Sequence, residues 1–165
     1  MALIALSVAD SLAYVSDRDP CKKKNEVPID PADPSKGTRE EVVIEEGATT
    51  FYLKGLDVFL MGHIYDNASA LTGRQGSDEV GIQTRVNKTN IEAVRHGLAG
   101  FENFCNSQGQ PIKFTTKTID VNGREYKVAS DDVLNTLGIH LIQELAGEIK
   151  RISEVSADEE KKSGA

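Results

Sequence analysis

An Asn-Gly pair, Asn122 and Gly123, limits the fold more than any other feature of the sequence. It stands between two runs, TIDV and REYKV, in which apolar and polar residues alternate. A two-residue Asn-Gly loop between such runs favours a type I′ β-hairpin, because both central residues of that turn take positive φ. Counting outward from the turn gives the expected cross-strand pairs, Val121 with Arg124 and Ile119 with Tyr126, with Val128 next on the core side. The chain is therefore expected to contain an antiparallel sheet.

Two further strands are expected between residues 41 and 54. The runs EVVIEE and TTFYLK flank a Gly-Ala pair there. In the second run Phe51 and Leu53 alternate with Tyr52 and Lys54, which is typical of a half-buried strand.

A helix is expected directly afterwards, over residues 58–69. Asp57 is placed as its N-cap, because a carboxylate accepts hydrogen bonds from the free amides of the first helical turn. The apolar residues that recur at helical spacing are expected to face the core: Val58, Met61, Ile64, Tyr65 and Ala68.

The middle of the chain predicts a loop, a strand and a second helix. LTGRQGSDE is a loop by composition, and residues 79–87 alternate with Val80, Ile82, Thr84 and Val86 on one face, as a strand would. Thr89 and Glu92 then form a capping box. The apolar stripe of this second helix is Ile91, Val94, Leu98 and Phe101, and Gly100 is expected to end it in a left-handed conformation.

A last helix is expected over residues 131–153, capped by Ser130 or Asp131. Gly138 is expected to break or kink it, because glycine costs about 1 kcal/mol in a helix interior. Residues 154–165 follow as a charged, frayed tail. The buried stripe of the helix is Leu134, Leu137, Leu141, Leu145, Ile149 and Ile152.

The first 40 residues are expected to form an arm and a linker. Residues 16–40 hold four of the chain's five prolines and many charges, so a regular element is not expected there, and Lys22-Lys23-Lys24 is interpreted as part of a solvated loop. The arm either docks onto another subunit or folds back onto its own domain. Its candidate interaction residues are Leu3, Ile4, Leu6, Val8, Leu12 and Tyr14.

The stretch HGLAGFENFCNSQGQPIKF, residues 96–114, combines an aromatic pair, a turn and a strand-like end. Phe101 and Phe104 are three residues apart, so both rings can insert under the next strand, and Asn-Ser-Gln-Gly reverses the chain. We interpret the stretch as a structural corner rather than a ligand site. The residues of this corner are Gly100, Phe101, Phe104, Gly109 and Phe114.

No motif for catalysis or cofactor binding is present in the sequence. There is no GxxxxGK[ST], GxGxxG or HExxH, and the three histidines lack metal-ligand spacing. His63 and His140 are expected on helices, and His96 precedes a helix end, where a cation interacts favourably with the macrodipole. We therefore expect no enzyme activity, metal or cofactor.

Charge and cysteine content narrow the function further. The formal net charge of −7 argues against nucleic-acid binding, which needs clustered Lys and Arg. Cys21 and Cys105 are expected to be free thiols, because no secretory signal supports a disulfide. The apolar N-terminus is interrupted by Asp10 and is too short for a membrane span.

Three segments of the chain carry a resemblance. The order ATTFYLKGLD…GHIYD, then AVRHGLAGFENFCNSQGQPIKF, then IQELAGEIKRISEVSADEEKK, within residues 48–162, resembles small acidic proteins encoded in the structural-gene clusters of tailed bacteriophages. Members have a helix ending in Gly-Leu-x-Gly-aromatic-x-Asn-Phe, a turn, and a closing Glu-Leu-Ala-x-Glu-Ile helix. The resemblance implies a virion component or a morphogenesis factor and supplies no catalytic residues.

The sequence thus predicts a small α+β domain over residues 41–153, preceded by the arm and linker (1–40) and followed by the tail (154–165). Its fold is expected to have a small antiparallel sheet with a type I′ hairpin and two or three packed helices.

The expected function is a non-enzymatic phage structural protein of the head, neck or tail. Its expected partners are other phage proteins, and a homo-oligomer is an alternative assembly. It would be assembled in the host cytoplasm and reside in the virion. The alternatives are a tail-assembly chaperone absent from the finished particle and an acidic host-interaction protein.

Overall fold

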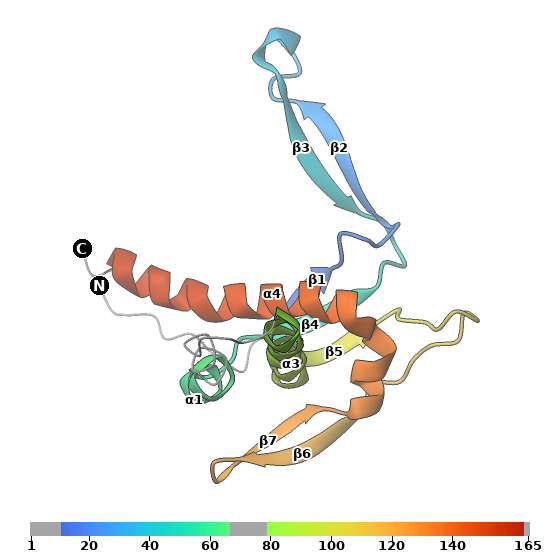
Figure 1. Ribbon diagram of the computed structural model, residues 1–165. Coiled ribbons are helices and arrows are strands. Elements are labelled where there is room, and N and C mark those ends of the chain that lie inside the picture. Colours follow the sequence, from blue (N-terminus) through green and yellow to red (C-terminus); the bar gives the residue numbers. More distant parts are fainter. Residues whose placement is uncertain (1–10, 67–78, 164–165) are drawn as a thin grey trace.

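The computed structural model describes residues 11–66 and 79–163, and side chains from 79 to 85 and beyond 154 are not described (Figure 1). The fold is α+β, with small antiparallel sheets and helices. The elements in chain order are β1 (Ser11–Val15), β2 (Lys22–Pro28), the 3₁₀ turn η1 (Pro34–Lys36), β3 (Thr38–Ile44), β4 (Thr50–Lys54), α1 (Val58–Met61), the π-helical turn η2 (Gly62–Asp66), α3 (Glu79–Gly97), β5 (Leu98–Glu102), β6 (Thr116–Val121), β7 (Arg124–Ala129) and α4 (Asp131–Ser163).

The central sheet has the order β1-β4-β5, with both pairs antiparallel. Its middle strand β4 confirms the predicted alternation, because Phe51 and Leu53 are fully buried while Tyr52 and Lys54 are half-buried. The buried face of β4 shares one core with α1, η2, α3, β7 and α4. The core is mainly aliphatic outside the ring cluster around Phe51.

Helix α4 crosses the whole body (Figure 1). Ser130 caps it, because the amide of Leu134 donates to the Ser130 carbonyl at 3.2 Å and the amide of Val133 donates to Ser130 Oγ at 3.4 Å. The predicted kink at Gly138 is confirmed by φ 74° and ψ 159°. The helix runs on to Ser163, so the predicted end at residue 153 is wrong.

The strand predicted over residues 79–87 is wrong, because α3 already begins at Glu79. The Thr89–Glu92 capping box is wrong for the same reason, since Thr89 lies inside the helix. Helix formation propagates easily once a stable turn exists, and the turns around Ala93 and Val94 are fully buried against the core. An alternating Val/Ile/Thr run has no strong preference of its own for strand over helix when packing decides.

Helix α3 ends at Gly97 and the chain passes directly into β5. The helix end predicted at Gly100 is therefore wrong: Gly100 lies within β5 and is not among the residues with positive φ. Leu98, expected on the helix, starts this strand.

Asp57 caps α1 as predicted, with its carboxylate accepting from the amide of Leu60 at 2.8 Å. The predicted stripe is confirmed in part: Ile64 is buried, and Met61 and Tyr65 pack against the core. Val58 is 76% exposed, so its assignment to the core is wrong, and Leu60, which the stripe left out, is buried. Leu60 and Ile64 are four residues apart, so they lie on the same side of this helical segment. Ala68, also predicted for the core, lies outside the described residues.

Strands β6 and β7 form the hairpin expected around Asn122 and Gly123. Both residues have positive φ, 53° and 82°, which a type I′ turn requires. The I′ type itself stays a prediction. The register also agrees, with Val121 opposite Arg124 and Ile119 opposite Tyr126. Val128 is buried as expected.

A second hairpin occupies the segment predicted to be an irregular linker. β2 and β3 pair antiparallel over seven residues each, so the prediction of no regular element in residues 16–40 is wrong, as is the solvated loop at Lys22-Lys23-Lys24. The prolines do not prevent pairing, because Pro28 ends β2 and Pro34 begins η1, the positions where a missing amide is tolerated. The division into arm, domain and tail stays a prediction.

Candidate protein interface: the β2–β3 hairpin

The β2–β3 hairpin stands away from the body, on the other side of α4 from the β6–β7 hairpin (Figure 1). Every residue of β3 is exposed, and only Lys22 and Val27 of β2 are half-buried. β3 nevertheless carries Val42, Val43 and Ile44, whose exposed fractions are 49%, 40% and 53%. These aliphatic side chains add nothing to the protein's own core, which makes the hairpin the strongest candidate for a binding surface.

The β2–β3 register gives the hairpin two faces, because residues directly opposite each other in an antiparallel pair share a face. Lys24 lies opposite Val42, and Glu26 lies opposite Glu40. We name this side the Lys24 face. Its members are Lys22, Lys24, Glu26 and Pro28 of β2 with Thr38, Glu40, Val42 and Ile44 of β3.

The base of the hairpin is anchored to the body. Lys22 Nζ donates to the carbonyl of Val15 at 2.8 Å and pairs with Asp17 at 2.6 Å. The amide of Glu45 donates to the carbonyl of Cys21 at 2.8 Å, across the two strand ends. These bonds fix the direction in which the hairpin leaves the central sheet.

The tip of the hairpin has its own hydrogen bonds. The Asp33 carboxylate accepts from the amide of Ser35 at 3.1 Å and so caps η1. The amide of Ile29 donates to the carbonyl of Gly37 at 3.1 Å, and Lys36 pairs with Asp30 at 2.9 Å. The tip is thus a defined turn built from the Pro- and Asp-rich residues.

Of the six predicted interaction residues, Leu3, Ile4, Leu6 and Val8 lie outside the described residues. Leu12 and Tyr14 belong to β1, which pairs with β4 of the same chain. Leu12 is 53% exposed and remains available to a partner. Over residues 11–15, the arm therefore folds back onto its own domain.

Glu144 of α4 holds this strand and was missed by the sequence. Its carboxylate accepts from Tyr14 Oη at 2.8 Å, from Ser16 Oγ at 3.0 Å and from the amide of Asp17 at 3.0 Å. Burial and the bond to Glu144 raise the pKa of Tyr14 well above its usual value. No local pattern distinguishes Glu144 from other helix-surface carboxylates, because its partners are about 130 positions away.

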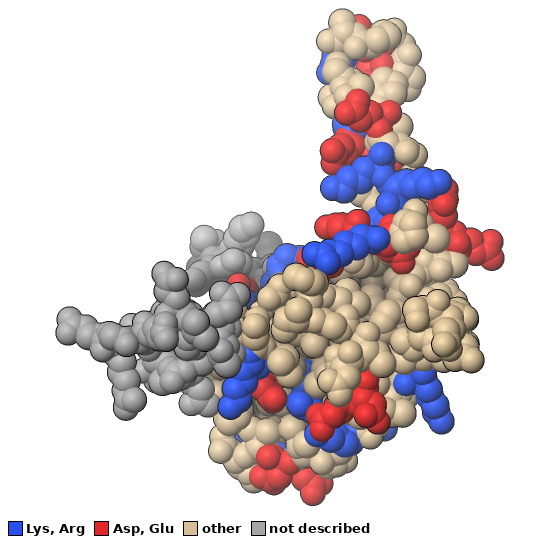
Figure 2. Space-filling view, turned by 45° about the vertical axis from the view of Figure 1, so that its right-hand side comes forward, with Lys and Arg blue, Asp and Glu red and all other residues tan. Residues whose placement is uncertain are grey.

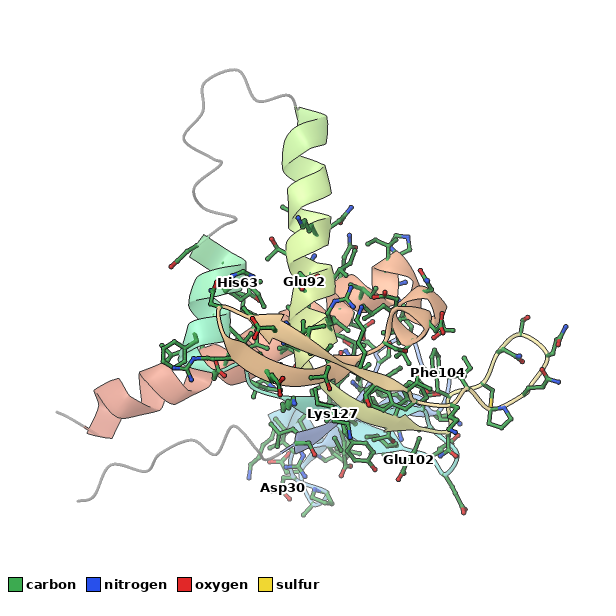
Figure 3. The ribbon with its side chains drawn as sticks, turned by 90° about the horizontal axis from the view of Figure 1, so that it is seen from below. Asp30, His63, Glu92, Glu102, Phe104 and Lys127 are labelled. Atoms are coloured by element: carbon green, nitrogen blue, oxygen red, sulfur yellow. The ribbon has the colours of Figure 1, made fainter. Side chains whose placement is uncertain are left out.

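The predicted structural corner gathers aromatic rings around Phe51 of β4. Phe101 and Phe104 lie with ring centroids 6.3 and 5.5 Å from that of Phe51, and Phe101 lies 5.4 Å from Phe114, all in edge-to-face geometry. Phe104 lies where the following loop leaves the body (Figure 3). This ring packing is what a structural corner requires.

The loop beyond these rings reverses the chain at residues 106–109. Asn106 Oδ1 accepts from the amide of Gln108 at 3.0 Å, and Gly109 takes the left-handed φ of 77°. The strand-like Pro-Ile-Lys-Phe forms no strand; only Pro111 makes an isolated bridge, with Cys105. Cys21 and Cys105 are both free thiols.

His96 is buried, with an exposed fraction of 3%, and neither ring nitrogen has a hydrogen-bond partner in the described structure. Its ring packs edge-to-face on Tyr126, with centroids 5.4 Å apart. Burial lowers the pKa of His96. His96 lies in the last turn of α3, as predicted, but burial disfavours the cation that was expected there. The charged and titratable groups that also act on it are Glu92, Arg95, Lys54 and His63.

We expect the free energy of unfolding to fall as the pH is lowered through about 6.5, the pKa of histidine in the unfolded chain. The lowered folded-state pKa means that the folded protein binds the His96 proton less readily, so acid favours unfolding. The loss should continue until the pH reaches the folded-state pKa. Urea titrations at about pH 7.5 and pH 5 measure it.

The matched variants are His96→Leu and His140→Leu, because His140 is exposed on α4. His96→Leu should reduce the difference in unfolding free energy between the two pH values, and His140→Leu should leave most of it. An unchanged difference in His96→Leu would show that other groups cause the acid sensitivity.

Comparison with known protein families, with curated proteins and with solved structures gives no match for this chain. Among residues 11–66 and 79–163, no helix is both long and apolar enough to cross a bilayer. The same described residues contain no cluster of three His, Cys, Asp or Glu side chains that could hold a metal ion.

Proposed function

We propose that the protein is a non-enzymatic structural component of a tailed-bacteriophage particle, and that it binds other proteins of the particle through the β2–β3 hairpin and the N-terminal arm. The observation that carries the binding role is the exposure of Val42, Val43 and Ile44 on a hairpin that contributes nothing to the core. The assignment to a phage rests on the resemblance within residues 48–162.

The physical argument starts from the stability of the hairpin. An isolated two-stranded hairpin is marginally stable in water, and its edges offer unpaired backbone groups to other strands. Here the base is anchored through Lys22, and the six cross-strand pairs beyond the Lys22–Ile44 pair extend into solvent. A partner that covered the hairpin would bury the aliphatic side chains and stabilise the strands. A projecting hairpin with exposed aliphatic side chains is therefore suited to assembly.

A shortened hairpin tests the proposal. Replacing residues 24–42 with Asn-Gly leaves Lys22, Lys23 and Val43, and so keeps the anchored base and supplies a two-residue turn. The shortened protein should unfold at nearly the wild-type temperature, because the removed residues lie outside the core. Quantitative mass spectrometry of purified phage particles should detect the wild-type protein and find the shortened protein depleted.

Two outcomes would contradict the proposal. If the shortened protein were incorporated into particles at the wild-type level, the hairpin would not be part of the interface. Absence of the wild-type protein from finished particles, with recovery of the protein on an unassembled tail protein, would instead indicate an assembly chaperone.

A further inference from the structure

The charges on the Lys24 face are divided along the hairpin. Nearer the body, Lys24 stands beside Val42 and Ile44; nearer the tip, Glu26 lies directly opposite Glu40. Lys24, Glu26 and Glu40 make no hydrogen bond or ion pair with any other described residue. Lys22, in contrast, is neutralised by Asp17. The face therefore has a basic, apolar inner half and an acidic outer half.

The arrangement has a cost in the isolated chain. Like charges directly opposite each other on paired strands are destabilising, and Glu26 and Glu40 occupy such a pair. A cation placed over them from outside would remove that repulsion. Figure 2 shows the projecting hairpin with Lys and Arg side chains across its middle and acidic side chains on either side, so charges of both signs are open to a partner.

The opposite face lacks the same division. Lys23 is paired with Glu45 at 2.5 Å, and the outer half carries both Glu41 and Arg39. The Lys24 face is thus the side of the hairpin whose two halves have unbalanced charge of opposite sign.

We propose that the Lys24 faces of two copies of this chain pack against each other, with the two hairpins running in opposite directions. This inference rests on the proposed function and names one partner for the hairpin. A twofold axis between the faces and perpendicular to the strands reverses base and tip. Lys24 of each copy then lies over Glu26 of the other, close to Glu40, and Ile44 lies over Thr38.

A second copy is favoured over a different protein because the face already carries both members of each ion pair. A different protein would need a surface with an acidic half that faces the inner half of the hairpin and a basic half that faces the outer half. A second copy of this chain, related by a twofold axis, supplies such a surface by symmetry. Twofold dimers are also the commonest closed assemblies, and their interfaces are self-complementary in this way. Complementary charges of this kind contribute mainly to specificity and association rate, while the aliphatic side chains supply buried area.

Charge reversals at Lys24 and Glu26 test the arrangement in the full chain. Wild-type protein should dimerise in sedimentation equilibrium, more weakly at high salt. Lys24→Glu alone and Glu26→Lys alone should each weaken dimerisation by roughly tenfold or more, because each places like charges together. The double variant Lys24→Glu/Glu26→Lys should restore the homodimer. A one-to-one mixture of the two single variants should form a heterodimer.

The matched control is Glu41→Lys, which makes the same change in net charge on the opposite face of β3. It should leave the dimerisation constant nearly unchanged. Equal weakening by Glu41→Lys and Glu26→Lys would overturn the assignment to the Lys24 face, as would failure of the double variant to recover dimerisation.

A wild-type protein that stays monomeric would overturn the inference but not the proposed function. In that case, loss of the shortened protein from particles would still place the hairpin against another component. Conversely, a dimer with the expected charge behaviour that is absent from particles would leave the inference standing and contradict the proposed function.

Discussion

Replacing Phe51 with alanine is expected to lower the free energy of unfolding by about 3–5 kcal/mol, the cost of deleting a fully buried aromatic side chain. Phe51 is 1% exposed and is the largest fully buried side chain of the described core. Its ring makes edge-to-face contacts with Phe101 and Phe104. The variant loses the apolar burial and the ring contacts, and it leaves a cavity in the middle strand of the central sheet. Urea denaturation of wild type and variant measures the difference.

The matched variant for this experiment is Phe104→Ala. Phe101 and Phe104, the rings of the predicted structural corner, are only half-buried, unlike Phe51. Removing Phe104 should therefore cost clearly less than removing Phe51. Equal losses would mean that the three rings act as one unit, and a negligible loss at Phe51 would mean that the core collapses around the gap.

The sequence predicted correctly those elements whose structure is determined by residues close to one another along the chain. The Asn122-Gly123 turn sets its own register, the alternation around Phe51 needs only a sheet with one buried face, and Ser130 caps its own helix. Gly138 interrupts α4 where its sequence places it. In each case the determining interaction lies within a few residues.

Where the predictions were wrong, the structure depends in part on contacts between residues far apart in the sequence. The alternating run at 79–87 is helical because it continues the packed turns around Val94. The β2–β3 hairpin was predicted only in part: the strand expected at EVVIEE is confirmed over residues 41–44. The prediction for residues 16–40 was wrong because their composition is typical of a linker, and only the register shows that the prolines fall at strand and turn ends. This same misinterpretation concealed the candidate interface, which the sequence placed instead in residues 3–14.

The anchoring of that interface depends on long-range contacts as well. Glu144 holds β1 through Tyr14 and Ser16, and the base of the hairpin is tied to the end of β1 through Lys22 and Val15. Glu144 and Lys22 are ordinary surface residues by local pattern. The candidate site could therefore be found from exposed β-branched residues only once the strands were known.

Replacing Gly97 with alanine is expected to lower the free energy of unfolding by about 1–3 kcal/mol or more, through overpacking. A β-carbon at Gly97 would lie 2.6 Å from both Cδ1 and Cγ2 of Ile149, and 2.8 Å from its Cγ1. Ile149 is fully buried on α4, so its side chain has no free space into which to move. The backbone itself is not the obstacle, because Gly97 does not have positive φ. The absence of a side chain at Gly97 is thus what allows α3 to approach α4.

Two further variants separate this steric effect from the general effect of a glycine-to-alanine change. Gly147→Ala, also in α4, meets no atom within 4 Å and should raise stability by up to about 1 kcal/mol, the difference in helix propensity. Ile149→Ala alone should cost about 2–5 kcal/mol. In the double variant Gly97→Ala/Ile149→Ala, the new methyl group occupies part of the space that Ile149 left. The sum of the losses in the two single variants should therefore exceed the loss measured for the double variant by about 1–3 kcal/mol. Strict additivity in this double-mutant cycle would show that the close approach of the two helices does not limit the size of residue 97.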